Sequence, residues 1–304
     1  MKKIIYKMFG SFRSFPIFWM RVVYCALVLL AVSTRAGAWG PTGHRITGVF
    51  AERLLTTKAK KKIKIFMGEE SLAEASTWAD EMRSHPDRKY YGKFDPWHYV
   101  EVPIGMNPIE LVKLKTNSSG NVLIAIDQLE KTLRDTKSKP EEKREALRLF
   151  VHFIGDIHQP LHVGNGLDKG GNTCKVKWFG ETTNLHRVWD EHLIDYRKMS
   201  YSEWVGMNHN ATAAQIKAWQ SSPVDQWASE SIQIRTKLYP SDSRDAELDP
   251  KKRKYCGTSF EDKIDEKFVP NLKYDYAFDH METVKLRLYQ AGVRIAGRLN
   301  TIFR

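Results

Sequence analysis

The sequence predicts a mainly α-helical single domain with short β-hairpin segments. From Trp39 onward, apolar residues recur at intervals of three and four over most of the chain, as expected for helices with one buried face. Alternation of apolar and polar residues, the pattern of a strand, occurs only in two short stretches. The 304 residues are 42% hydrophobic and 28% charged, which is typical of a globular protein and excludes a fibre or a disordered tail.

The first 38 residues have the pattern of a secretory signal peptide. A basic leader precedes the apolar run 22–32, which is too short as a helix to cross a hydrocarbon core of about 30 Å. Small residues follow at Ala36-Gly37-Ala38, so we expect cleavage after Ala38 and a mature domain over residues 39–304. Cleavage predicts a secreted or periplasmic protein without a stable membrane anchor. An uncleaved signal anchor is the alternative.

The net charge and the cysteine content limit which binding partners and which cellular compartment are expected. The whole chain carries a net charge of +12, and removal of the leader leaves 42 basic against 36 acidic residues, a net charge of +6. This excess is compatible with a polyanionic partner without requiring one. Cys174 and Cys256 remain after cleavage, and they form either one disulfide or two free thiols. Sequons at Asn117 and Asn210 matter only in a eukaryotic source.

Four apolar stripes and the two alternating stretches locate the expected elements. The stripes predict helices, because residues three and four apart share one helix face. In chain order they are Ile46, Val49, Phe50 and Leu54; Leu72, Ala75, Ala79 and Met82; residues 146–157; and Val284, Leu288, Ala291, Ile295 and Leu299. The alternating stretches are residues 97–102 and 174–179, each short enough to be one arm of a hairpin.

Proline, glycine and charge mark the expected connections. Residues 103–108, with a proline at each end, predict a turn, and the glycine-rich residues 164–172 predict a flexible loop. Residues 240–254 are charged and aperiodic, which predicts a surface excursion. The five lysines from Lys58 to Lys64 predict a solvated helix face, and contact with phosphate is the alternative.

Histidine and aspartate recur at a spacing that suits metal binding. His152 and Asp156 are four residues apart on a predicted helix, so both side chains leave the same face one turn apart. Pro160 ends that helix, which lets His162 approach from another direction. His186 and Asp190 repeat the spacing of four. One such pair is an ordinary helix-surface contact, but two pairs with a third histidine, in a chain of ten histidines, predict a metal centre.

Two upstream residues are weaker candidates when each is taken alone. Asp80 lies on the apolar face of its predicted helix beside Trp78, and His98 lies on the inward face of the predicted strand 97–102. The structural alternatives are a capping acid and a hydrogen-bonded core imidazole.

Six motifs together resemble the zinc-dependent nucleases of the S1/P1 type. They are Trp39-Gly40-x-x-Gly43-His44, Trp78-Ala79-Asp80, Trp97-His98-Tyr99, the string from His152 to His162, Asp168-x-Gly170-Gly171-Asn172, and Asn184-Leu185-His186-x-x-Trp189-Asp190. The resemblance covers nearly the whole mature chain and implies the helical fold of the phospholipase C/P1 nuclease type. It also implies three Zn²⁺ ions and hydrolysis of single-stranded DNA and RNA to 5′-phosphate products, with 3′-nucleotidase activity. A monomer is expected.

The resemblance implies a ligand set for each zinc ion. One ion would be held by Asp80, His98, His152 and Asp156, a second by His162, His186 and Asp190, and a third by His44, Asp156 and both the free amine and the carbonyl oxygen of Trp39. Imidazole and carboxylate without thiolate fit open catalytic zinc. The remaining histidines, His85, His158, His192, His209 and His280, are expected to be non-ligands. Of these, His158 either orients a ligand through a hydrogen bond or faces solvent.

Four further roles are expected beside the ligands. Asp80 would orient the attacking water as a catalytic residue, and Arg83 would support the charge of the transition state, although the family pattern has lysine there. Tyr99 would stack on an unpaired base, with simple packing as the alternative, and Asn172 would donate or accept hydrogen bonds to base or phosphate.

Two other functions are compatible with parts of this pattern. A zinc-dependent phospholipase C shares the fold, but the short spacing from Trp39 to His44, the aspartate at position 190 and the motif Asn184-Leu185-His186 match the nuclease form. A non-catalytic secreted module that binds nucleic acid is the second, yet a net charge of +6 makes a poor electrostatic binder without metals.

Overall fold

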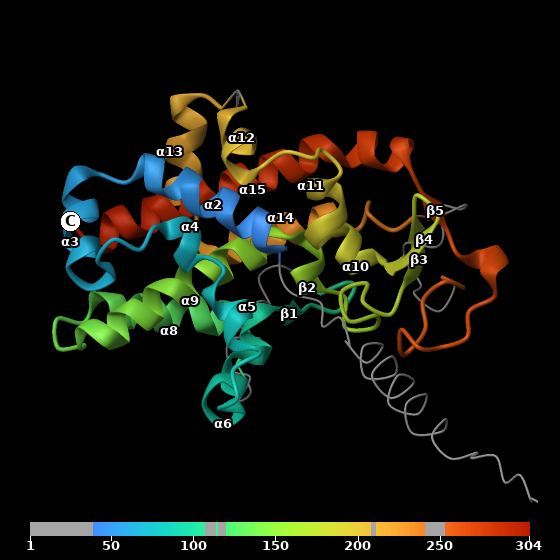
Figure 1. Ribbon diagram of the computed structural model, residues 1–304, viewed down its shortest axis with the longest axis horizontal. Helices are drawn as coiled ribbons and strands as arrows, with labels where there is room; N and C mark the ends of the chain where they lie inside the picture. Colours follow the sequence, from blue (N-terminus) through green and yellow to red (C-terminus); the bar gives the residue numbers. More distant parts are fainter. Residues whose placement is uncertain (1–38, 107–113, 115–119, 208–210, 241–252) are drawn as a thin grey trace, which may run out of the picture. The chain divides into compact units, whose positions relative to one another are not determined.

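The computed structural model describes residues 39–106, 114, 120–207, 211–240 and 253–304, and Figure 1 shows their arrangement. The predicted signal peptide, the asparagines of both sequons, His209 and most of the predicted excursion 240–254 lie outside the described residues. The described chain is mainly helical, which confirms the predicted fold class. No described helix is both long enough and apolar enough to span a bilayer.

The elements follow one another mostly as helices with short connections. The helices are α2 (Pro41–Leu54), α3 (Thr57–Met67), α4 (Leu72–Ala75), α5 (Trp78–Met82), α6 (Arg88–Tyr91), η1 (Gly92–His98), α8 (Val122–Arg134), α9 (Pro140–His158), η3 (Pro160–His162), α10 (Leu185–Arg187), η4 (Val188–His192), α11 (Leu193–Asp195), α12 (Tyr201–Gly206), α13 (Ala213–Ser221), α14 (Val224–Arg235), η7 (Glu266–Phe268) and α15 (Tyr274–Ile302). The strands are β1 (Val100–Glu101), β2 (Val163–Gly164), β3 (Lys175–Trp178), β4 (Glu181–Asn184) and β5 (Asn271–Leu272).

Three long helices, α2, α9 and α15, form the frame that carries the candidate ligands. Three of the four stripes predicted in the sequence are the buried faces of these helices, with Ile46 and Phe50 on α2 and Leu288 and Ile295 on α15. Helix α8 packs beside α9, to which residues 135–139 join it as a helical hairpin (Figure 1). Apolar side chains from both sides of this frame form two buried clusters.

Helices α2 and α15 approach closely because a glycine lies at their contact. A Cβ atom on Gly292 would lie 2.3 Å from Cβ of Phe50 and 2.9 Å from the carbonyl oxygen of Thr47. Replacement Gly292→Ala is therefore expected to push the helices apart and to lower the free energy of unfolding by about 1 to 3 kcal/mol, as overpacking of a core does. Denaturant unfolding of both proteins measures the loss.

The matched control is Gly206→Ala near the end of α12, where a Cβ atom would meet no atom within 4 Å. A Gly292→Ala protein as stable as Gly206→Ala would contradict the close approach of α2 and α15.

The second predicted stripe is divided between two short helices. Ser71 and Glu74 form a capping box that starts α4, and α4 ends at Ala75. Ser76 and Thr77 separate it from α5, although Leu72, Ala75 and Ala79 are all buried as the stripe requires. The division leaves the carbonyl oxygen of Ser76 available to a ligand candidate, as described below.

The strand predicted over residues 97–102 is wrong in extent and in pairing. Trp97 and His98 end the 3₁₀ helix η1, in which Pro96 holds a turn conformation, and extended backbone starts only at Tyr99 (φ −146°, ψ 170°). Strand β1 is limited to Val100–Glu101 and pairs with β2 in parallel, so it is not a hairpin arm. The predicted burial of one face is correct, because His98, Val100 and Val102 are all buried.

The hairpin predicted around residues 174–179 is confirmed as β3 and β4. The two strands are antiparallel and join through Phe179 and Gly180, whose positive φ angles of 50° and 96° suit a two-residue hairpin turn. Strand β5 adds to β3 in parallel. Of the two states left open for the cysteines, the structure has the disulfide Cys174–Cys256, which joins the start of this sheet to residues that lie 82 positions later.

Candidate metal centre

The carboxylate of Asp156 is the meeting point of three histidines from three elements. It lies one turn beyond His152 on α9, as the spacing predicts, and its Oδ2 atom is 3.0 Å from Nδ1 of His98 and 3.4 Å from Nε2 of His152. Its Oδ1 atom is 3.3 Å from Nε2 of His44, in the first turns of α2. All four side chains are buried.

Asp80 lies at the accessible edge of this group. Its Oδ1 atom is 3.9 Å from Nε2 of His152 and 3.4 Å from Nη1 of Arg83, one turn further along the chain. About a fifth of the Asp80 side chain is exposed, whereas those of His152 and Asp156 are fully buried. Asp80 therefore lies in the same group as His152 and Asp156, and it is the member of the group that solvent reaches.

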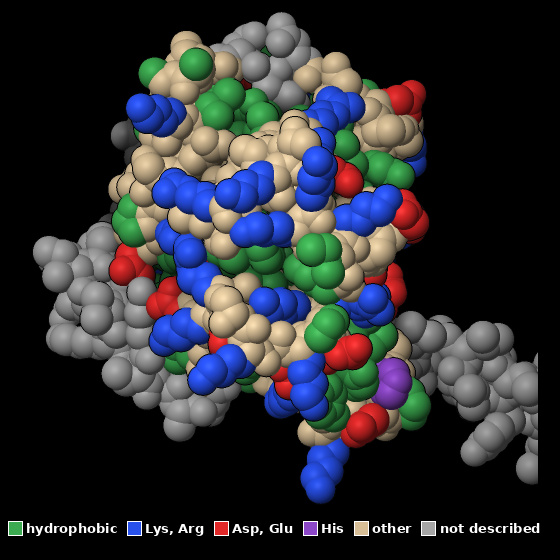
Figure 2. Space-filling view, turned by 90° about the vertical axis from the view of Figure 1, so that its left-hand side faces the viewer, with side chains coloured by type: hydrophobic (Ala, Val, Ile, Leu, Met, Phe, Trp, Pro, Cys, Tyr) green, Lys and Arg blue, Asp and Glu red, His purple; other side chains and the backbone are tan. Residues whose placement is uncertain are grey.

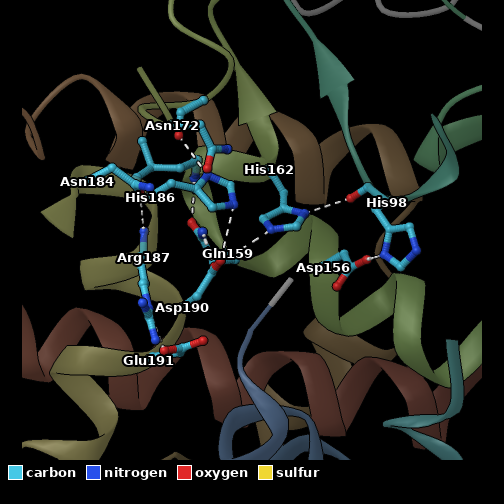
Figure 3. A network of polar contacts seen from close by, with 12 residues as sticks. His98, Asp156, Gln159, His162, Asn172, Asn184, His186, Arg187, Asp190 and Glu191 are labelled. Atoms are coloured by element: carbon cyan, nitrogen blue, oxygen red, sulfur yellow. Dashed lines mark hydrogen bonds and ion pairs between the residues drawn. The ribbon is translucent and has the colours of Figure 1, made fainter. Parts of the chain in front are cut away.

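A second group consists of His162, His186 and Asp190. Nε2 of His186 is 3.1 Å from Oδ2 of Asp190, and Nε2 of His162 is 3.7 Å from Oδ1. Figure 3 shows both rings turned toward this carboxylate, while His98 and Asp156 lie on the other side of His162. His162 comes from η3, directly after Pro160 ends α9, as expected, and Asp190 comes from the π-helical turn η4.

Backbone carbonyl groups fix the tautomer of three of these histidines. The Nδ1 atoms of His152, His162 and His186 lie 2.7 Å from the carbonyl oxygens of Ser76, His98 and Gly170, respectively. A carbonyl oxygen can only accept, so each Nδ1 carries the hydrogen in the neutral ring and each Nε2 keeps a lone pair directed at the carboxylates. Histidine ligands of metals are oriented in this way.

Several buried polar atoms in both groups make no hydrogen bond within the described chain. They are Nδ1 and Nε2 of His44, Nε2 of His98, Oδ1 of Asp156, Nε2 of His162 and Oδ2 of Asp190. Unsatisfied buried polar atoms are costly and rare, so their concentration here indicates a bound group that accepts nitrogen and oxygen lone pairs.

The spacing of the ligand atoms fits zinc. Two ligand atoms at about 2.0–2.1 Å from a tetrahedral zinc ion lie about 3.3–3.4 Å from each other. The separations between the imidazole nitrogens and the carboxylate oxygens of Asp80, Asp156 and Asp190 range from 3.0 to 3.9 Å, on both sides of that value. The donors are imidazole and carboxylate, and the two described cysteines are joined in a disulfide, which leaves no thiolate for a closed structural site.

The electrostatics of the first group keep Asp156 ionised. Burial alone would raise the pKa of Asp156, but the neighbouring imidazoles of His152, His44 and His98 hold this pKa well below its usual range. Burial lowers the pKa of His44 and of His98. The pKa of His152 is raised despite burial, because Asp156 and Asp80 stabilise its charged form.

In the second group, a proton on Nε2 of His162 would compete with a metal ion for that nitrogen atom. Burial would lower the pKa of His162, but the nearby carboxylates of Asp190 and Asp156 raise it to about 9. A metal ion must displace this proton before Nε2 can act as a ligand.

Gln159 is a functional residue that the sequence reasoning missed. Its Nε2 atom donates to Oδ1 of Asp190 at 2.6 Å, and its Oε1 atom accepts from the backbone N–H of Leu161 at 2.6 Å. It is fully buried and joins the end of α9 to the second group. Its position between His152 and His162 in the sequence could have indicated this residue. It was missed because a glutamine amide is neither an imidazole nor a carboxylate, the two kinds of ligand predicted.

Replacement Gln159→Leu is expected to weaken zinc binding at His162, His186 and Asp190 by about 10- to 100-fold, because Asp190 loses the group that orients it. Competition with a chelator of known affinity measures the change. The control is Gln290→Leu, which removes another buried, hydrogen-bonded glutamine that contacts Arg287 on α15. Equal zinc affinity in the two variants would contradict the role of Gln159.

Both expectations for His158 are wrong. Its ring is fully buried and points away from both groups of ligand candidates, with Nδ1 donating to the carbonyl oxygen of Ile154 and Nε2 accepting from Arg294 on α15. Burial and the charges of Arg287 and Arg294 hold its pKa well below the usual range, so it is neutral. It belongs to the packing between α9 and α15.

The expected substrate residues lie at the surface beside the centre. Tyr99 follows His98 and exposes 45% of its surface, which contradicts the alternative of simple packing. Asn172 is partly exposed and donates from Nδ2 to the carbonyl oxygen of Lys169 (Figure 3). The loop that carries Asn172 is held by the buried Asp168, whose Oδ1 atom accepts from the N–H of Gly171.

Trp39, an expected ligand of the third zinc ion, lies directly ahead of α2. Its indole is fully buried and packs beside Gly43, one residue before His44. The N–H of the next residue, Gly40, donates to the carbonyl oxygen of Asp190 at 2.8 Å. The segment Trp39-Gly40 therefore contacts both α2 and the turn that carries Asp190.

The chain is similar to a family of nucleases and to several individual nucleases and endonucleases. The family described as S1/P1 Nuclease matches residues 39–304. The chain is 31% identical to Endonuclease 4 of Arabidopsis thaliana over 290 residues, which are 91% of this chain and 93% of that protein. It is 28% identical to Nuclease S1 of Aspergillus oryzae over 291 residues, which are 93% of this chain and 98% of that protein. Nuclease P1 of Penicillium citrinum is 31% identical over 162 residues, 51% of this chain and 58% of that protein.

Proposed function

The chain belongs to the S1/P1 nuclease family of phosphodiester hydrolases, and from this premise we propose that it is a secreted endonuclease with three zinc ions. Its substrates are single-stranded DNA and RNA, cleaved to products that end in 5′-phosphate, and 3′-nucleotides. The observation that carries the proposal is the concentration of unsatisfied buried nitrogen and oxygen atoms around Asp156 and Asp190.

The described side chains support three ligand sets. The first is Asp80, His98, His152 and Asp156; the second is His162, His186 and Asp190; the third is His44, Asp156 and the amine and carbonyl oxygen of Trp39. Asp156 belongs to two sets, and its two oxygen atoms already face different histidines, Oδ1 toward His44 and Oδ2 toward His98. A carboxylate that is ionised and fully buried is suited to bridge two cations.

Zinc ions in these positions would lower the pKa of bound water toward about 7 and neutralise charge on a phosphate. Asp80 remains ionised, since His152 and His98 lower its pKa against the effect of burial, and its partly exposed carboxylate accepts a hydrogen bond from the attacking water. Arg83, partly buried and 3.4 Å from Asp80, supports the negative charge of the transition state.

Tyr99 and Asn172 are the proposed contacts to substrate outside the ligand sets. A tyrosine ring with nearly half its surface exposed, directly after the ligand candidate His98, offers a face on which an unstacked base can lie. The partly exposed amide of Asn172 follows the loop whose Gly170 orients His186, so a bound nucleotide that contacts Asn172 lies beside the second ligand set.

Secretion is supported by the disulfide, because such bonds persist mainly in oxidising compartments. It agrees with the predicted removal of residues 1–38 and with a family match that starts at residue 39.

The deciding experiment measures the metal content of the mature protein and its hydrolysis of four substrates. Single-stranded DNA, RNA, 3′-AMP and phosphatidylcholine are offered to protein whose zinc content has been measured. We expect three zinc ions per chain and hydrolysis of the first three substrates. Hydrolysis of phosphatidylcholine alone would establish a phospholipase C instead, and zinc without hydrolysis of any substrate would establish a binding module.

Zinc retention is expected to fall as the pH is lowered. Protons compete with zinc for the imidazole and carboxylate atoms. Because the pKa of His162 is about 9 in the metal-free centre, this competition is already present at neutral pH and does not require acid. Dialysis at a series of pH values from about 8 to about 4, followed by elemental analysis, measures the loss. Activity that persists after the zinc has left would contradict a metal mechanism.

A further inference from the structure

Helix α3 presents an unusual concentration of positive charge to solvent. Five of its eleven residues are lysine and none is acidic, and the five lysines, Lys58, Lys60, Lys61, Lys62 and Lys64, are all exposed. Lys217 on α13 and Arg304 after α15 are exposed close to the start of α3. We call Lys58, Lys60, Lys61, Lys217 and Arg304 the basic face.

Helix stability does not explain this arrangement. Lys58 with Lys61 and Lys60 with Lys64 are spaced by three and four residues, and like charges at these spacings repel each other on a helix surface. Lys58 also lies in the first turn, where the helix dipole disfavours a cation. The charges therefore oppose the formation of α3, which indicates that they have another role.

Most of these charges have no partner in the described part of the chain. Lys64 pairs with Glu69 at 2.6 Å, and Nζ of Lys62 donates to the backbone carbonyl oxygen of Arg304 at 2.6 Å. Among the described residues, no ion pair neutralises Lys58, Lys60, Lys61 or Lys217.

An open pocket of about 570 Å³ lies within the basic face. Lys58, Lys217 and Arg304 supply cations to its wall, and Thr56, Ser221 and Asn300 supply hydroxyl and amide groups. No Asp or Glu side chain is among the described residues that line it. Cations together with neutral hydrogen-bonding groups are the surroundings in which phosphate oxygens are bound.

The basic face lies away from the metal centre. Helix α2 carries His44 in its first turns and ends at Leu54 before α3, a rise of about 15 Å between these two residues. Figure 1 shows α3 and the C-terminus at one end of the helical frame, and Figure 2 looks onto that end. Lys and Arg side chains gather across the middle of this view, and Asp and Glu lie mainly near its edges.

We propose that the basic face binds the phosphate backbone of a long nucleic acid, part of which lies at the metal centre. The proposal rests on the proposed nuclease function and adds a second contact region to it. A nucleic acid is favoured over an anionic membrane for two reasons. The cations of the pocket surround a hollow that a flexible chain can enter, and Ile65, 80% exposed, is the one large apolar side chain of α3 that is available for insertion into lipid.

Binding of one strand at both the basic face and the metal centre makes the KM of the enzyme depend on substrate length. A strand held at the basic face remains close to the metal centre, so its effective concentration there rises. A dinucleotide is too short to reach both regions and gains nothing. Because lysine contacts to phosphate release counterions, the gain for long strands must also weaken with salt.

The test variant is Lys58→Gln with Lys60→Gln and Lys61→Gln, and the control is Lys254→Gln with Lys263→Gln and Lys267→Gln. Both remove three exposed charges, but the control residues lie in the segment before β5, far from α3 in the sequence. For a single strand of roughly 60 nucleotides, we expect the test variant alone to raise KM about 10-fold and to reduce the slope of log KM against log salt by about 2. The rate with a dinucleotide stays unchanged in both proteins.

A binding measurement separates this inference from the proposed function. Fluorescence anisotropy of a phosphorothioate single strand, which resists cleavage, should show the same rise in Kd for the test variant even if the wild type hydrolyses nothing. Equal Kd values for wild type, test variant and control would overturn the inference. Loss of sedimentation with phosphatidylglycerol vesicles in the test variant, with an unchanged Kd for the strand, would overturn it in favour of a lipid surface.

Discussion

Replacement Asp156→Asn is expected to abolish hydrolysis and to release more than one zinc ion per chain. The two oxygen atoms of Asp156 face His44 on one side and His98 and His152 on the other, so this carboxylate serves two proposed ligand sets. The amide of asparagine is neutral and offers only one oxygen atom, so it cannot bridge two cations. Removal of several kcal/mol of transition-state stabilisation corresponds to a fall in kcat of at least about 10³-fold.

Elemental analysis and single-strand hydrolysis test this prediction together. The control is Asp279→Asn, which makes the same chemical change at an exposed position on α15. Thermal unfolding in zinc checks that both variants fold. An Asp156→Asn protein with three zinc ions and full activity would refute the bridging role.

A chain extended by even one residue ahead of Trp39 is expected to hold about two zinc ions instead of three and to lose at least about 100-fold in activity. The backbone nitrogen of an internal residue is an amide without an available lone pair. As the first residue, Trp39 carries an amine with a pKa of about 7.7–8.0, which can lose its proton and form a five-membered chelate ring with its own carbonyl oxygen. Trp39 is fully buried beside Gly43, so the chain start is close to His44.

A comparison of three proteins distinguishes loss of the free amine as a ligand from steric interference by added residues. They are the mature chain from Trp39, the same chain with a Gly-Ser extension, and the mature chain acetylated at its α-amine, which adds no residue. We expect the extended and the acetylated proteins to lack the same zinc ion. Full zinc content and activity in the acetylated protein would remove the amine from the proposed ligands, and with it the proposal that cleavage of the signal peptide activates the enzyme.

The sequence predicts the ligand candidates well because their spacing follows the helix period. His152 with Asp156 and His186 with Asp190 lie four residues apart, and the structure brings each pair to a common centre. Asp80 and His98 are weak candidates when each is taken alone, and only the resemblance to a family assigns them to a zinc ion, because no local pattern says that two distant segments converge on α9.

The parts that sequence could not predict involve the backbone and short elements. The carbonyl oxygens of Ser76 and Gly170 orient His152 and His186. Every residue has a carbonyl oxygen, so the sequence does not reveal which of them will accept a hydrogen bond from a histidine. The alternation in residues 97–102 indicated burial correctly, but a 3₁₀ turn ending at His98 places the same side chains inward as a strand would. Periodicity distinguishes such elements only when they are long.

The wide separation of the ligand candidates along the chain has a consequence for biosynthesis. His44 comes from α2 and Asp190 from the turn η4, and the other candidates that bind through a side chain lie between them. At about 5–20 residues per second, a ribosome needs about 7–30 s to add the residues from His44 to Asp190. The disulfide further ties Cys174 to Cys256, which is made later still. A nascent chain therefore lacks the complete set of ligand candidates until Asp190 has been added, and it lacks the disulfide until Cys256 has followed.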